Sequence, residues 1–157
     1  MSEQPRRIMR VITQLNVSGV ALHAILLAAR MRDAGYETQL VAGAPSSDDD
    51  SLLDVARSYD VEPILLPELV GISNPLRAWQ ATRILHSRMR EFQPHIVHTH
   101  TTSAGFPGRV GARLAGVPVR VHTFHTHPFF GYYSRTDTLL FTLVERIGTR
   151  LADSIIT

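Results

Sequence analysis

The 157-residue sequence contains no cysteine and no lysine, and each absence removes whole classes of chemistry. Without cysteine the chain cannot form disulfides, thiolate metal sites or a cysteine nucleophile. Without lysine it cannot form a Schiff base or supply the lysine of a phosphate-binding P-loop. All sixteen basic residues are arginines, which we attribute to a GC-rich coding sequence rather than to function.

The chain also lacks long apolar runs and a strong net charge. No stretch approaches the roughly 20 residues that span a bilayer, and no signal-peptide core follows the polar N-terminus. The net charge of +2 gives no case for a nucleic-acid partner. We therefore expect a cytoplasmic protein, in which Arg6, Arg7 and Arg10 either flank the first strand or contact the inner face of the membrane peripherally.

Apolar residues are plentiful enough for one folded domain over residues 1–157. They make up 44% of the chain, which supports a full core. Short β-rich runs alternate with amphipathic segments along the whole length. This alternation predicts an α/β, Rossmann-like fold, with a parallel sheet covered by helices on both faces.

The expected elements follow from periodicity and from capping residues. Strands are expected at 8–13, 38–42, 63–66, 95–100, 119–123 and from 153 onward. Helices are expected at 21–32, 52–59, after Asn74 and Pro75, at 103–115, where Pro107 should disturb the first turn, and near 140–151. The first helix should bury Leu22, Ile25, Leu26 and Ala29, and the last Leu140, Leu143, Val144, Ile147 and Leu151.

Ligands bind such sheets beyond the carboxyl ends of the strands, and the first of these ends carries a small-residue turn, Asn16 to Gly19. A turn of this kind at a helix start leaves free N–H groups that suit an anion. The dinucleotide fingerprint G-x-G-x-x-G is absent. A plain serine-capped connection explains the turn equally well, and His23 in the next helix is equally well a surface residue.

Two histidines of the fourth strand, His98 and His100, share a face about 6.6 Å apart. This spacing allows joint zinc ligation, with His122, His125 or His127 as a third ligand. No acidic residue lies near them in the sequence to complete a catalytic centre. We therefore expect no metal, and keep a metal-dependent hydrolase built on His98, His100 and His125 as an alternative.

The stretch from Val121 to Ser134 combines histidines, aromatic rings and a glycine, and follows the fifth strand. There an imidazole of His125 or His127 can donate to a hydroxyl or phosphate, or act as an acid or base. The alternative is a structural loop whose rings cover the sheet edge. A serine triad is poorly supported, because G-x-S-x-G is absent and Ser103 has no evident acidic partner.

Taken together, segments 8–19, 26–38, 94–105, 108–118 and 121–134 resemble the N-terminal, acceptor-side domain of a family 4 retaining glycosyltransferase of the GT-B fold. The resemblance implies two Rossmann-like domains facing a cleft, a UDP- or GDP-linked sugar donor, and a glycan or lipid-linked acceptor. It implies no metal or other cofactor. It also implies a C-terminal donor-binding domain beyond these residues, so the chain alone is expected to be inactive. A nucleotide-sugar epimerase half and a non-catalytic binding module remain as alternatives.

The resemblance also assigns individual residues. His125 matches the family's histidine near the donor sugar and the reacting centre, and is the expected catalytic residue. Gly19 matches the second glycine of the first turn, while Ser18 and Thr126 stand where the family usually has glycine. The expected donor- or acceptor-binding residues are Asn16, Ser18, Gly19, His23, His100, Thr101, Ser103, Thr126 and His127.

Overall fold

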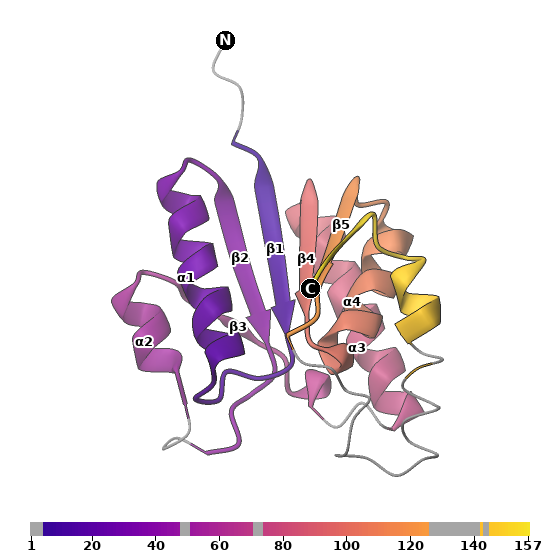
Figure 1. Ribbon diagram of the computed structural model, residues 1–157, viewed down its shortest axis with the longest axis horizontal. Helices are drawn as coiled ribbons and strands as arrows, with labels where there is room; N and C mark the ends of the chain where they lie inside the picture. The colour runs from indigo at the N-terminus through magenta and orange to yellow at the C-terminus, as the bar shows by residue number, and fades with distance from the viewer. Residues whose placement is uncertain (1–4, 48–50, 71–73, 126–141, 143–144) are drawn as a thin grey trace.

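The computed structural model describes residues 5–47, 51–70, 74–125, 142 and 145–157. Its centre is a six-stranded sheet in the order β3-β2-β1-β4-β5-β6 (Figure 1). The strands are β1 (Arg7–Ile12), β2 (Glu37–Ala42), β3 (Ile64–Leu65), β4 (Ile96–His100), β5 (Val119–Thr123) and β6 (Ser154–Ile156). The helices are α1 (Gly19–Asp33), α2 (Leu53–Ser58), α3 (Pro75–Phe92) and α4 (Thr102–Ala115), with a 3-10 turn, η1 (Pro67–Leu69). The predicted α/β, Rossmann-like fold is confirmed.

Every strand pair is parallel, so all carboxyl ends lie at one edge of the sheet. The chain runs outward from β1 through β2 to β3, then returns to place β4 on the other side of β1. The direction of winding therefore reverses between β1 and β4, which is where sheets of this kind form ligand crevices. In the register, Arg10 lies opposite His98, and Thr99 opposite His122.

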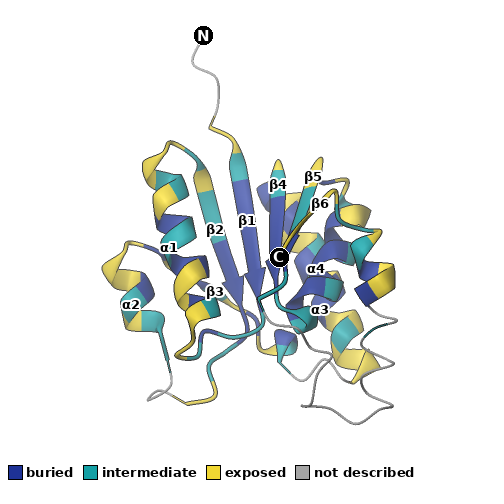
Figure 2. Cartoon of the chain, viewed as in Figure 1, coloured by how far each residue is buried: buried dark blue, intermediate teal, exposed yellow. Residues whose placement is uncertain are grey.

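The two faces of the sheet carry separate apolar cores. On one face, residues of α3 and α4 pack with Met9, Val11 and Val97. On the other face, residues of α1 and α2 pack with Ile12 and Leu40. Figure 2 shows the central strands buried along most of their length, as expected for a parallel sheet with helices on both sides.

The buried side of α1 is only partly the predicted one, because Ile25 and Ala29 are buried as expected but Leu22 and Leu26 are not among the buried residues. Leu22 is 40% exposed, and the buried residues are Ala21, Ala24, Ile25, Ala28 and Ala29. A search for large apolar residues selects the leucines, but the helix turns its alanines to the sheet. Small side chains allow a helix to lie close to a strand layer without forming voids.

Glycines bring α4 close to the sheet. A Cβ at Gly105 would lie 2.6 Å from Cε1 of His122, and one at Gly108 would lie 2.6 Å from Cγ2 of Thr99. The helix continues through the buried Pro107, so the predicted irregular first turn is wrong. Packing on both sides holds α4 together despite the backbone hydrogen bond that proline removes. The unusual backbone lies instead at Thr101, with a φ of 66°.

A buried ion pair joins α4 to the helical segment 145–149. Nη2 of Arg109 is 2.9 Å from Oε2 of Glu145, and the two side chains are 0% and 4% exposed. Nε of Arg109 also donates to the carbonyl of Gly105. The segment turns Glu145 and Gly148 toward Arg109, so the predicted apolar stripe is wrong at Ile147, which is exposed. Leu140, Leu143 and Val144 lie outside the described residues.

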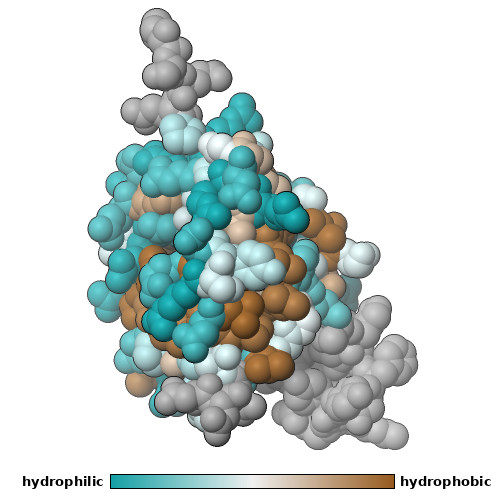
Figure 3. Space-filling model, turned by 90° about the vertical axis from the view of Figure 1, so that its left-hand side faces the viewer, coloured by the Kyte–Doolittle hydropathy of each residue, from teal (hydrophilic) through white to brown (hydrophobic). Residues whose placement is uncertain are grey.

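The surface on the side of α1 and α2 mixes polar side chains with an apolar area near its middle (Figure 3). Among the described residues, no helix combines the length and the apolar character that crossing a bilayer requires.

We predict that Glu145→Ala lowers the free energy of unfolding by about 3–5 kcal/mol, because it leaves the buried Arg109 charge uncompensated. Urea unfolding followed by circular dichroism measures this. The matched control is Asp54→Ala, which removes an acid from an exposed pair with Arg57 and should change stability little. Equal effects of the two substitutions would contradict the structural role assigned to Glu145.

Candidate functional site

The loop after β1 brings three of the predicted residues to the carboxyl edge of the sheet. Asn16 fastens this loop to the loop after β2, because its side chain donates to Oγ of Ser46 and accepts from the Ser46 N–H, both at 3.0 Å. Ser18 caps α1 by accepting from the N–H of Ala21. A Cβ at Gly19 would meet no atom within 4 Å, so the first residue of α1 faces open space.

The start of α4 lies at the same edge and is held by a residue that sequence analysis missed, Thr13. Its hydroxyl is hydrogen-bonded to the hydroxyl of Thr101 and accepts from the N–H of Ala104. The Thr101 hydroxyl also donates to the carbonyl of His100. Thr101 is therefore a structural residue in a backbone conformation that costs energy, of order 1–3 kcal/mol. Ser103 lies in the first turn of α4 at this edge.

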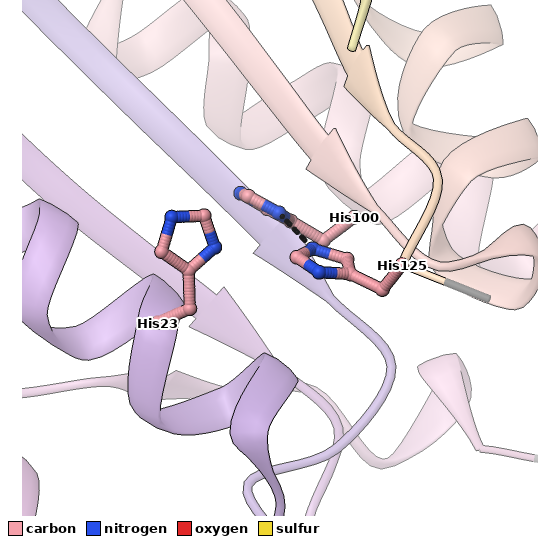
Figure 4. Close-up of side chains that lie close together, drawn as sticks. All are labelled: His23, His100 and His125. Carbon is pink, nitrogen blue, oxygen red and sulfur yellow. Dashed lines mark hydrogen bonds between the residues drawn. The ribbon is translucent and has the colours of Figure 1, made fainter. Parts of the chain in front are cut away.

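Three predicted histidines meet at this edge from three separate elements (Figure 4). His23 comes from α1, His100 ends β4, and His125 follows β5. Nδ1 of His100 is 2.9 Å from Nε2 of His125. The ring of His23 stands edge-on to both, with centroids 5.9 Å from His100 and 5.5 Å from His125. His23 is exposed on the surface of α1, and its ring nevertheless belongs to the cluster.

His98 does not join the cluster. Its Nε2 is hydrogen-bonded to Oγ1 of Thr123 at 2.8 Å, although its ring packs on that of His100. Arg10, which sequence analysis did not single out as a site residue, lies beside His98 in the sheet and is only 1% exposed. Its Nε and Nη1 are buried and have no hydrogen-bond partner among the described residues. The set of His98, His100 and His125 expected for a hydrolase is thus not formed.

Two of the clustered histidines, His100 and His125, are neutral at physiological pH. Burial, followed by the charges of His98, His125, His23 and Arg10, lowers the pKa of His100 to about 2. Burial, followed by the charge of His23, lowers the pKa of His125. Each ring therefore offers one N–H donor and one acceptor nitrogen.

The hydrogen bonds favour one arrangement of protons. Nε2 of His100 is buried without a partner in the described part of the chain. An unpaired buried acceptor is less costly than an unpaired buried N–H, so we assign the His100 proton to Nδ1, which donates to Nε2 of His125. His125 then carries its own proton on Nδ1, where it is available to a ligand.

The remaining conspicuous residues lie elsewhere. His122 is on the opposite face of the sheet, where Nδ1 is 2.9 Å from Oγ1 of Thr99. Thr126 and His127 lie outside the described residues. A hollow lined by Arg7, Gln93 and His95, among others, lies at the amino-terminal edge, away from the predicted site.

Most of the chain matches a known protein family. A family model described as Glycosyltransferase Family 4 matches residues 17–157. The chain belongs to Glycosyltransferase Family 4. The predicted resemblance is thereby confirmed, and the match includes every predicted site residue except Asn16.

Two curated relatives of this family 4 domain are transferases. The chain is 28% identical over 96 residues to the Escherichia coli UDP-Gal:alpha-D-GlcNAc-diphosphoundecaprenol alpha-1,3-galactosyltransferase, covering 61% of this chain and 25% of that protein. It is 27% identical over 128 residues to the Serratia proteamaculans UDP-N-acetylglucosamine--N-acetylmuramyl-(pentapeptide) pyrophosphoryl-undecaprenol N-acetylglucosamine transferase. This match covers 78% of this chain and 35% of that protein. The matched region thus spans a quarter to about a third of these relatives.

Solved structures confirm the architecture. The domain superposes on a putative UDP-N-acetylglucosamine 2-epimerase from Listeria monocytogenes with a TM-score of 0.67 and 14% identity, covering 96% of this chain and 38% of that one. Identity this low shows the fold alone, which is one half of the GT-B fold. The fold is shared with epimerases, so the family match, and not the superposition, favours a transferase over the epimerase and hydrolase alternatives.

We predict that this family 4 domain loses stability as the pH falls below about 6.5, the pKa of an unfolded histidine. The folded-state pKa values of His98, His100 and His122 are lowered by burial to about 4, 2 and 3. Between those values and 6.5 the unfolded chain binds more protons, so unfolding is favoured as pH falls, by up to about 1.4 kcal/mol per pH unit for each histidine.

Urea unfolding at pH 7.5, 6.0 and 5.0 in the presence of EDTA tests this. The window lies above the ordinary pKa of carboxylates, so histidines dominate it. A free energy of unfolding that stays constant from pH 7.5 to 5.0 would contradict the burial of neutral imidazoles.

Proposed function

We propose that this domain holds the acceptor in a reaction that moves a sugar from a nucleotide-sugar donor to a lipid-linked glycan, with retention of configuration. The names of both curated transferases include a UDP-linked sugar and an undecaprenol-linked sugar. The family match over most of the chain carries the proposal. The histidine cluster at the crossover of the sheet supplies its chemistry.

The groups at the edge suit sugar hydroxyls better than a diphosphate. His100 and His125 are neutral imidazoles, His23 stands edge-on to both, and the hydroxyls of Thr13 and Thr101 lie at the same edge. Neutral donors and acceptors match the hydroxyls of a sugar, whereas a diphosphate calls for cations or several free N–H groups. This contrast supports assigning the acceptor to this domain and the nucleotide to a second domain, in the same polypeptide or a separate one.

Within this proposal, His125 is the residue that contacts the reacting sugars. Its Nδ1–H donates to a sugar hydroxyl, and His100 holds the ring in place through the 2.9 Å hydrogen bond to Nε2. His100 itself is fully buried and acts through His125 as a positioning residue. The lowered pKa of His125 keeps the ring uncharged, so Nδ1 acts as a neutral hydrogen-bond donor to the sugar.

Apolar surface next to the cluster fits an acceptor attached to a lipid. Val17 is 65% exposed in the turn before α1, and the exposed Leu22 directly precedes His23. Exposed apolar side chains beside a polar site suit a substrate that is a sugar at one end and an isoprenoid at the other. We propose that this edge faces the cytoplasmic surface of the membrane when the acceptor binds.

We predict that His125→Ala lowers kcat/KM for sugar transfer by about 10–100-fold, because one hydrogen bond to the substrate is lost. The assay uses the domain together with its donor-binding domain, a UDP-sugar and an undecaprenyl diphosphate-linked acceptor. The matched control is His86→Gln on α3, on the opposite face of the sheet, which should retain full activity. A kcat/KM for His125→Ala equal to that of the parent protein would remove this residue from the mechanism.

We further predict that the purified 157-residue chain folds and binds the lipid-linked acceptor but does not transfer sugar, because the domain forms only one wall of the cleft. Calorimetric titrations with the acceptor, UDP-galactose, UDP-N-acetylglucosamine and GDP-mannose measure binding. Release of UDP or GDP measures turnover. Turnover by this chain alone would contradict the division of labour between two domains.

A further inference from the structure

We propose that His23, His100 and His125 form a binding site for a first-row transition-metal ion such as Zn²⁺. The proposal is independent of sugar transfer, because it rests only on the positions of the three rings. Each ring offers one ligand nitrogen, and the three nitrogens lie within 4.8 Å of one another. Three imidazoles are a sufficient protein ligand set for Zn²⁺, with a water in the fourth position.

The distance between two of the rings is already close to that of a metal centre. Nδ1 of His100 and Nε2 of His125 are 2.9 Å apart, with a proton between them. Two nitrogens at tetrahedral angles on Zn²⁺ are about 3.4 Å apart, since each Zn–N bond is about 2.0–2.1 Å. A metal ion can replace the shared proton if these rings separate by a few tenths of an ångström.

The third ring has the freedom to complete the site. His23 is exposed on α1, so its side chain can turn toward the other two without disturbing the core. No sequence pattern pairs His23 with His100, because 77 residues separate them. His23 supplies the third imidazole. A site without carboxylates can bind a metal ion, because neutral imidazoles alone are good ligands for zinc, copper and nickel.

The buried end of His100 gives a second indication. Its Nε2 has no hydrogen-bond partner among the described residues, although the residue is fully buried. No described group holds Nε2 as an acceptor, so this nitrogen can carry the ring proton when Nδ1 binds a metal ion.

Two features limit the expected affinity. The missing partner at Nε2 removes the outer hydrogen bond that usually strengthens a metal-bound histidine. The buried guanidinium of Arg10 is close enough to affect His100 electrostatically and opposes a cation there. We therefore expect a reversible site, weaker than a closed structural zinc site.

Titration of the full 157-residue chain with Co²⁺ tests the proposal. The protein carries no affinity tag and is treated with EDTA, which is then removed. We expect one equivalent of Co²⁺ to produce the visible absorption of four-coordinate cobalt, and one equivalent of Zn²⁺ to abolish it. His23→Gln and His125→Gln should each weaken Co²⁺ binding at least about tenfold.

His86→Gln is the matched control, because this histidine lies on α3, remote from the cluster, and should bind Co²⁺ like the parent chain. Circular dichroism checks that each variant is folded, and neither His23 nor His125 is fully buried. Absence of cobalt binding by the parent chain overturns the proposal, as does binding that His23→Gln leaves unchanged. Because no sugar is present, these outcomes do not depend on whether the domain serves a transferase.

Discussion

Parallel pairing of β1 with β4, and of β4 with β5, is the constraint on which the site depends. It brings the carboxyl ends of these strands to one edge, and the reversal of winding between β1 and β4 opens that edge to ligands. His100 ends one strand and His125 follows the next, while α1 brings His23 against them. A shift of β4 by one residue would turn His100 to the opposite face and dissolve the cluster.

The buried imidazoles at this edge are polar, and burial keeps them uncharged. His98 and His100 are held neutral chiefly by burial, and the nearby charge of Arg10 adds to this effect. Uncharged groups of this kind select a ligand by the geometry of its hydrogen bonds rather than by electrostatic attraction.

Local patterns predicted most of the fold, and tertiary contacts decided the remainder. Each strand was predicted within a residue of its position, and the Asn74 cap was predicted correctly, because apolar runs and capping residues are local signals. The alanine face of α1 and the exposed Ile147 were not, because each depends on what the helix packs against. Likewise, His23, His100 and His125 were each predicted as site residues from the sequence. That His23, and not His98, completes their cluster depends on tertiary structure. Thr13 and Arg10 carry no motif, so no sequence signal identified them.

The ion pair between Arg109 and Glu145 has a consequence for how this domain can diversify. Together with β5 it anchors the chain on both sides of residues 126–144, at His125 and at Glu145. A connection between two anchored points can change in length at small entropic cost, about 0.6 kcal/mol for each doubling. A change in the length of this connection would therefore leave His125 and Glu145 in place.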